Sequence, residues 1–246
     1  MAKAVKIKSP SQRARDDARR QAQASRRRRN RLMLVAGVLA VAAVAALIII
    51  GAISRDGGGG STATVANKEG KTLGLATAPV TLTAWEDFQC PFCKQANAGP
   101  IQQVINDYVN TGKVKIEYKQ FPFLGNGGSK DESVLAAEAS ECANDQGSFW
   151  PYHDALFDAQ AGENRGAFSA ANLKKIAADV GLDQEAFASC LDSGKYRSAV
   201  LAEKAQGDKL GITSTPTFFI NGQKVVGNQP YSVFKDAIEK ALQAAQ

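Results

Sequence analysis

Cys90 and Cys93 are the residues of this sequence whose type and spacing point most directly to chemistry. They flank Pro91 and Phe92, where a β-rich run gives way to a helical pattern. A helix start offers unpaired N–H groups and a positive dipole end, and both stabilise a thiolate. Pro91 is tolerated there because the first turn has no intrahelical donor to lose. We therefore expect Cys90 to be an acidic, exposed nucleophile and Cys93, one turn later and deeper, to be the resolving thiol.

An inert structural disulfide and half of a zinc site are two other uses of such a pair. A four-cysteine zinc site would need a second close pair, whereas Cys142 and Cys190 lie far apart in the sequence. These two are expected to form a structural disulfide, because the cysteine count is even and the compartment inferred below is oxidising. Two free buried thiols are the alternative. The single histidine, His153, lies in a helical stretch, which favours packing or helix capping over catalysis.

The surrounding pattern predicts one α/β domain that positions the pair. Its predicted elements, in chain order, are strands at 79–85 and 113–121 around a helix at 94–110, a helical insertion at about 129–210, strands at 216–220 and 223–226, and a helix at about 231–245. A turn at Asn221-Gly222 joins the last two strands. A βαβ half, an insertion, and a hairpin with a closing helix predict a small sheet covered by helices.

The segment from Trp85 to Cys93 resembles the active-site segment of the DsbA-like branch of the thioredoxin family. The stretch 215–218 is similar to the family's cis-proline loop, and residues 139–157 and 190–194 resemble parts of the branch's helical insertion. This likeness covers about residues 77–246. It implies a thioredoxin-like fold and thiol-disulfide exchange at the cysteine pair, with no cofactor besides the redox-active disulfide. The residues expected to support the pair are Pro91, Phe92, Thr215 and Pro216.

If the bond between Thr215 and Pro216 is cis, as the resemblance implies, the backbone of Thr215 is free to hydrogen-bond an extended substrate chain beside Cys90. An ordinary loop proline is the alternative.

The sequence departs from that branch at two places. Many relatives carry an acidic residue six positions before the first cysteine, beneath the resolving thiol, where this sequence has Ala84. Glu86 and Asp87 are candidate substitutes, and solvated charges at a strand end are the equal alternative. The dipeptide between the cysteines also lacks the histidine of the strongest oxidants in the branch, so a milder oxidant is expected.

Positive charge is concentrated at the N-terminus. Of the chain's 30 Lys and Arg residues, 12 lie in residues 1–31, so the remainder carries more acidic than basic residues. A DNA-binding domain would spread its basic residues over a folded face, so no nucleic-acid partner is expected.

An uncharged apolar run from Leu32 to Ile50 follows the basic tail and is long enough to span a bilayer as a helix. The positive-inside rule then places the N-terminus in the cytoplasm and the domain outside. A cleaved signal peptide or a twin-arginine signal would also deliver the domain outside, but the length of the run favours an uncleaved single-pass anchor. The predicted parts are a basic cytoplasmic tail at 1–31, a membrane anchor at 32–53, a flexible linker at 54–76 and the DsbA-like domain at 77–246.

These observations predict a membrane-anchored protein-disulfide oxidoreductase that introduces disulfides into exported, unfolded or partly folded proteins. Reoxidation would need a membrane partner of the DsbB or vitamin-K-epoxide-reductase type. A reductase or isomerase using the same pair is the alternative within this chemistry. A membrane-tethered client-binding or sensor module without redox turnover is the alternative from another class.

Overall fold

The computed structural model describes residues 68–125, 128 and 131–245. The predicted basic tail at 1–31, the predicted membrane span at 32–53 and residues 54–67 of the predicted linker lie outside these ranges. Within them, no helix has both the length and the apolar character needed to cross a membrane.

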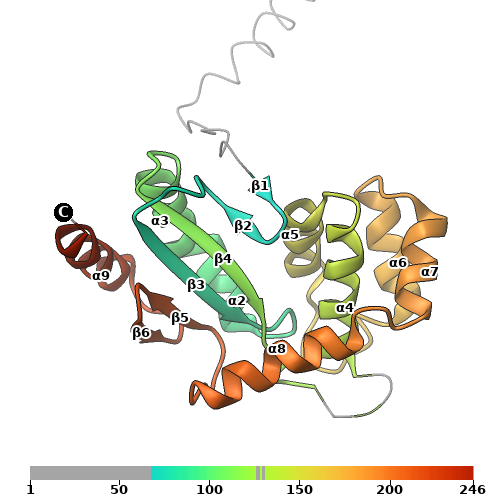
Figure 1. The fold of residues 1–246 in the computed structure, drawn as a ribbon. Coiled ribbons are helices and arrows are strands. Elements are labelled where there is room, and N and C mark those ends of the chain that lie inside the picture. The colour runs from blue at the N-terminus through green and yellow to red at the C-terminus, as the bar shows by residue number, and fades with distance from the viewer. Residues whose placement is uncertain (1–67, 126–127, 129–130, 246) are drawn as a thin grey trace, which may run out of the picture. The chain divides into compact units, whose positions relative to one another are not determined.

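The described strands form one mixed sheet in the order β1-β2-β4-β3-β5-β6 (Figure 1). Their bounds are β1 (Lys68–Glu69), β2 (Thr72–Leu73), β3 (Val80–Glu86), β4 (Val114–Gln120), β5 (Thr217–Ile220) and β6 (Gln223–Val226). The central strand β3 pairs in parallel with β4 and antiparallel with β5. The predicted order of βαβ unit, insertion and hairpin is thus confirmed.

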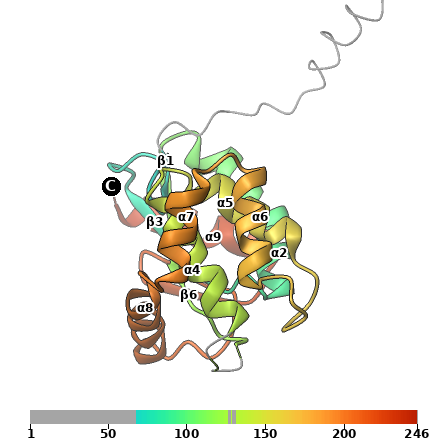
Figure 2. The same cartoon turned by 90° about the vertical axis from the view of Figure 1, so that its right-hand side faces the viewer.

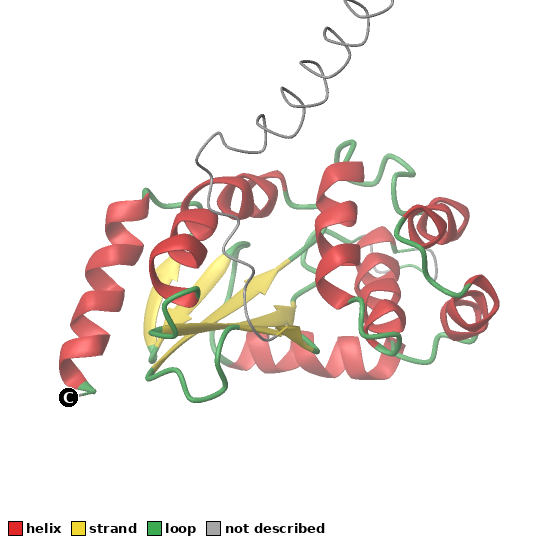
Figure 3. Cartoon of the chain, turned by 90° about the horizontal axis from the view of Figure 1, so that it is seen from above, coloured by secondary structure: helices red, strands yellow, loops and turns green. Residues whose placement is uncertain are grey.

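Side chains alternate across β3 and divide the core into two parts. Leu82 and Ala84 belong to the main core, whereas Trp85 points to the opposite face. There it packs with Phe121 and Ile212, on the side of the sheet that α8 (Arg197–Lys209) covers. Figure 3 shows helices on both sides of the sheet.

A helical segment follows β3 and covers the main-core face. It consists of α2 (Pro91–Ala96), the π turn η2 (Asn97–Ile101), α3 (Gln102–Val104) and the π turn η3 (Ile105–Val109). Pro100 lies inside η2 and has no N–H to donate, so a π turn accommodates it without ending the helix. The last helix, α9 (Tyr231–Ala244), packs against η2 and α3 and onto β3 and β5.

The helical insertion predicted at about 129–210 is confirmed, and Figure 2 faces its helices. They are α4 (Glu132–Asn144), α5 (Phe149–Ala159), α6 (Ala170–Asp179), α7 (Gln184–Asp192) and α8 (Arg197–Lys209). A disulfide between Cys142 and Cys190, with an S–S distance of 2.03 Å, joins α4 to α7.

The predicted linker at 54–76 is wrong in its last part. Its residues 68–73 form the hairpin of β1 and β2, and β2 pairs antiparallel with β4. Leu73 is buried in the main core, and the Lys71 ammonium lies 2.8 Å from Glu141 and 2.9 Å from Glu203. Strands of two residues are too short to show alternation, so the composition of this segment concealed them.

Candidate active site

Cys90 and Cys93 lie where β3 is followed by α2. Cys90 is the N-cap residue of α2, and Pro91 occupies the first helical position. The Cys93 N–H donates to the Cys90 carbonyl at 3.1 Å, and the Cys90 N–H donates to the Asp87 carbonyl at 2.9 Å. The strand end, a tight turn and the first helical turn therefore fix the backbone of both cysteines.

Cys90 differs from its prediction in exposure, since only 3% of its surface is accessible. Its thiol lies under the 215–216 loop and donates to the carbonyl of Thr215 at 3.3 Å. A hydrogen bond from Cys93, with further bonds from the Thr215 side chain and the N–H groups of Cys93 and Phe92, lowers the pKa of Cys90 to about 6 against the opposing effect of burial. Cys90 is thus acidic, as the helix start implies, but not exposed.

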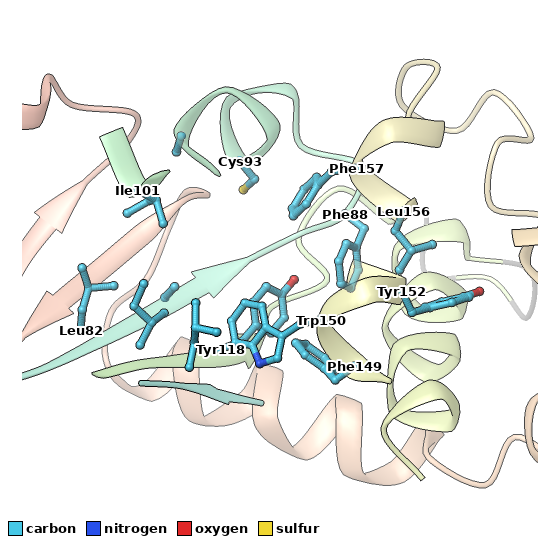
Figure 4. Packing of buried hydrophobic residues seen from close by; sticks show 14 of the residues in the cluster. Leu82, Phe88, Cys93, Ile101, Tyr118, Phe149, Trp150, Tyr152, Leu156 and Phe157 are labelled. Atoms are coloured by element: carbon cyan, nitrogen blue, oxygen red, sulfur yellow. The ribbon is translucent and has the colours of Figure 1, made fainter. Parts of the chain in front are cut away.

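Cys93 has the opposite character. It is fully buried, and burial, its hydrogen bond with Cys90 and the charges of Glu86 and Cys90 raise its pKa well above the ordinary value. In Figure 4, Cys93 lies beside a cluster that contains Phe88, Tyr118 and Phe157. At neutral pH, negative charge therefore concentrates on Cys90, while Cys93 keeps its proton.

Glu86 lies among the groups around Cys93, the region for which the acid missing at Ala84 was expected. Side-chain alternation along β3 brings it to the same face as Ala84, and it is 2% exposed. Asn97 donates to Glu86 Oε2 at 2.7 Å and also to the Cys93 carbonyl at 3.0 Å. Burial, with the charge of Cys90, raises the pKa of Glu86 to about 8. Glu86 is therefore largely protonated at neutral pH.

Asp87, the other candidate for the acid missing at Ala84, has a structural role. Its carboxylate accepts from the N–H groups of Phe123 and Leu124, each at 2.7 Å, from Gln89 N–H at 2.8 Å and from the Ser133 hydroxyl. These bonds tie the active-site turn to the loop after β4 and to the start of α4. Asp87 is buried, so the prediction of solvated strand-end charges is wrong for both residues.

The loop before β5 lies against the reactive sulfur. The bond between Thr215 and Pro216 is cis, and Thr215 is largely buried. The backbone of Thr215 was expected to be free for a substrate, but its carbonyl accepts the Cys90 thiol in this reduced structure. Phe92, between the cysteines, is 56% exposed and offers an apolar surface beside the site.

Gln160 and Gln89 contribute contacts that sequence analysis did not anticipate. Gln160, at the end of α5, donates to the carbonyls of Phe88 at 2.7 Å and Cys90 at 3.1 Å. Gln89 is fully buried and donates to Ser133 at 2.7 Å. Both tie the active-site turn to the insertion across tens of residues, and no local pattern signals contacts of that range.

The remaining two cysteines and the histidine form no hydrogen bond with the reactive pair that the structure shows. Cys142 and Cys190 are bonded to each other, so the four cysteines do not gather around a metal ion. His153 is buried among aromatic rings, with its ring centroid 4.9 Å from that of Phe157 and 5.2 Å from that of Tyr118. The structure therefore gives His153 a packing role.

Residues 66–240 match the thioredoxin family. The chain belongs to this family. Within it, the chain is 31% identical over 173 residues to disulfide bond formation protein D of Bacillus subtilis, covering 69% of this chain and 76% of that protein.

Solved structures agree with this assignment. The oxidised crystal structure of BdbD from Bacillus subtilis has a TM-score of 0.65 and 29% identity, covering 71% of this chain and 94% of that one. Wolbachia pipientis α-DsbA1 has a TM-score of 0.62 and 24% identity, covering 74% and 94%, and shows the fold alone. The chain is a DsbA-like thiol-disulfide oxidoreductase with a thioredoxin-like fold and a helical insertion.

Proposed function

We propose that this oxidoreductase introduces disulfides into exported proteins through Cys90 and Cys93. The observation that carries the proposal is the position of Cys90 at the start of α2 among hydrogen-bond donors, which lower its pKa to about 6. A stabilised thiolate stabilises the reduced enzyme relative to its disulfide, and this makes the disulfide more oxidising. Such an enzyme accepts electrons from substrate thiols rather than donating them.

The reaction begins when a substrate thiolate attacks Cys90 Sγ in the Cys90–Cys93 disulfide. The new bond joins substrate and Cys90, and Cys93 leaves as a thiolate. A second substrate thiolate then attacks the substrate sulfur of the mixed disulfide and releases Cys90 as a thiolate. Two substrate thiols are oxidised to one disulfide, and the enzyme disulfide is reduced to two thiols. Cys93 is completely buried, whereas Cys90 adjoins Phe92, which is 56% exposed, so attack at Cys90 is favoured.

Glu86 supplies the proton for the departing Cys93 thiolate. Its pKa of about 8 keeps it protonated at neutral pH, and its charge is coupled to both sulfurs. An acid with a pKa near the working pH is suited to this transfer. Glu86 therefore takes the part of the acid that Ala84 lacks.

The substrate chain docks beside Thr215 and the exposed ring of Phe92. In the disulfide form Cys90 has no thiol hydrogen, so the Thr215 carbonyl is released to accept an N–H from an extended substrate. An unfolded chain supplies such a segment and apolar side chains for Phe92.

The domain acts outside the cytoplasm, held at the membrane by residues 32–53 with the N-terminus inside. A membrane partner of the DsbB or vitamin-K-epoxide-reductase type reoxidises it, and the tether raises the local concentration for that encounter. The redox-active disulfide is the only redox group required. Protease added to cells whose cell wall or outer membrane has been removed, but whose cytoplasmic membrane is intact, should digest the domain and spare residues 1–31. A domain that resists this digestion would contradict the topology.

The decisive experiment is a redox titration of the Cys90–Cys93 pair against glutathione with Cys142 and Cys190 left bonded. A potential near about −120 mV, or somewhat lower for the milder oxidant that the sequence suggests, supports an oxidase, whereas about −270 mV would favour the reductase alternative. In parallel, Cys90→Ser and Cys93→Ser should each abolish oxidation of a reduced, unfolded protein, because neither variant can form the Cys90–Cys93 disulfide. Cys93→Ser should still form a mixed disulfide through Cys90 with a substrate that already carries a disulfide, because that exchange needs no other oxidant. If the wild type does not oxidise this protein and Cys90→Ser leaves the affinity for it intact, the binding module is favoured.

A further inference from the structure

Two buried polar atoms beside Cys93 have no hydrogen-bond partner among the described residues. They are Glu86 Oε1 and Tyr118 Oη, and both residues are 2% exposed. Leaving such a group unsatisfied is unfavourable, so buried polar groups of this kind usually bind ordered water.

The strand register brings these atoms together. Tyr118 of β4 pairs with Ala84 of β3, and Glu86 follows Ala84 by two residues on the same face. The phenol lies close enough for the charges of Glu86 and Cys93 to raise the pKa of Tyr118, after the larger effect of burial. Tyr118, Glu86 and Cys93 thus form one electrostatically coupled group, although no direct hydrogen bond joins the phenol to the carboxyl group.

One water molecule would satisfy both atoms. Buried waters typically make about three hydrogen bonds. Tyr118 Oη, Glu86 Oε1 and Cys93 Sγ supply three polar atoms on three different elements, β4, β3 and α2. Polar groups that are coupled but lie beyond hydrogen-bonding distance are commonly bridged in this way.

We propose that Tyr118 is a positioning residue for thiol-disulfide exchange, which orients one buried water between Glu86 and the sulfur of Cys93. This inference rests on the proposed role of Glu86 as the proton donor. When Cys93 leaves, the water gives a proton to its sulfur and receives one from Glu86 Oε1. The phenol donates to the water oxygen throughout and keeps its own proton.

Several other titratable or charged groups face this site and must be held constant in a test. They are Cys90 at the N-cap of α2, Asp87 just after β3, His153 on α5 and Glu203 on α8. None of them is changed by Tyr118→Phe, which removes only one hydroxyl.

The test measures how fast a small thiol reduces the Cys90–Cys93 disulfide of the full chain between pH 5 and pH 9.5. The rate of each protein is divided by the rate of Glu86→Gln at the same pH. This ratio removes the effect of pH on the fraction of the small thiol that is ionised. In the wild type the ratio falls as Glu86 loses its proton. In Tyr118→Phe we expect a rate about tenfold lower at neutral pH and a fall that begins about one pH unit higher, because the carboxylate has lost a water-mediated donor.

Tyr152→Phe is the matched control. Tyr152 is another fully buried tyrosine, but its hydroxyl donates to the Leu173 carbonyl at 2.9 Å within the insertion. Its pH profile should equal the wild-type profile. A Tyr118→Phe profile that also equals it, or an effect that persists in the Glu86→Gln background, would overturn the proposal.

A second measurement needs no variant. A high-resolution crystal structure of the reduced protein should show a water within hydrogen-bonding distance of Tyr118 Oη and Glu86 Oε1, and a dry site would overturn the inference. Any thiol-disulfide exchange enzyme performs the reaction with a small thiol. A redox potential typical of a reductase would therefore contradict the proposed oxidase function, but the effect of Tyr118→Phe could still be interpreted.

Discussion

Cys90 and Cys93 are close in sequence, yet their environments shift their acidity in opposite directions. Cys90 caps α2 and receives donors from Cys93, Thr215 and the first-turn backbone, whereas Cys93 points into the core beside Glu86. The helix start accounts for part of this difference and was visible in the sequence. The share due to the Thr215 side chain comes from a residue 125 positions along the chain.

Thr215→Val tests that long-range share. Removing the hydroxyl should raise the pKa of Cys90 by roughly half to one unit, because one hydrogen bond to the thiolate is lost. It should also make the disulfide less oxidising. Ultraviolet titration of the reduced protein reports the pKa, with Thr217→Val as the control, since the Thr217 hydroxyl donates to the Ser214 carbonyl. Equal shifts in both variants would assign the effect to packing.

Glu86→Gln tests the buried acid through the stability of the reduced protein. The pKa of Glu86 is raised from 4.5 to about 8, so its stabilising contribution is full below pH 4.5 and is lost as the pH rises to 8. The amide cannot ionise. The free energy of unfolding of Glu86→Gln, relative to that of the wild type, should therefore increase between pH 5 and pH 8 by up to a few kcal/mol and then level off. Urea unfolding at pH 5, 6.5 and 8.5 measures this, and a pH-independent difference would contradict it.

At this scale the sequence identified the cysteine pair, and the structure contains the second disulfide that it suggested. It did not separate Glu86 from Asp87. Strand alternation counted from Ala84 would have selected Glu86, because residues two apart share a face. The exposure of Cys90 and the contacts of Gln160 were beyond local reasoning, since both depend on loops distant in sequence.

Among the elements, α8 approaches the sheet closely because residue 207 is glycine. A Cβ there would lie 2.6 Å from the Phe121 ring and 3.1 Å from that of Trp85. These rings form the small core between α8 and the sheet. The sequence pattern predicted helices in this region but gave no sign of how near one would lie to Trp85.

Gly207→Ala should destabilise the protein by about 1–3 kcal/mol, because two aromatic rings must move to admit a methyl group. Gly99→Ala is the matched control. Gly99 is also helical, and a Cβ there meets nothing within 4 Å, so this change should be neutral or slightly stabilising. Denaturant unfolding of both variants tests the difference, and equal stabilities would show that α8 can move away at little cost.

The helix after the active site illustrates what periodicity leaves out. Apolar spacing predicted a continuous helix at 94–110, and the structure has one with two π turns. Each π turn adds a residue to a turn and shifts the facing side chains without breaking the apolar pattern. Pro100 was the available local signal of such a shift.

For the whole molecule, the order of elements was predictable because each long element carries its own pattern. The start of the domain was not. The family match begins at residue 66, and the first strands lie at 68–73, within the predicted linker. Their place in the fold depends on partners far along the chain, including Glu203 on α8 and Trp150 on α5, whose indole donates to the Thr72 carbonyl at 3.3 Å.

Shortening the chain tests whether this hairpin is part of the folded domain. A chain that begins at residue 77 loses the buried Leu73 and leaves Glu141 without the Lys71 ammonium, while Glu203 keeps Lys119 at 3.3 Å. We expect its free energy of unfolding to fall by at least about 2 kcal/mol relative to a chain that begins at residue 66, from burial of Leu73 alone.

Lys71→Met in the chain that begins at 66 separates the two contributions. It keeps the strands and removes the ion pairs, so its loss of stability should be smaller than that of the shorter chain. Urea unfolding with the Cys142–Cys190 disulfide intact measures all three proteins. If the chains that begin at 66 and 77 unfold at the same urea concentration, the hairpin only covers the domain. If the shorter chain is weaker, residues 68–73 hold β4 against the insertion, and β4 carries Tyr118 to the site of Cys93.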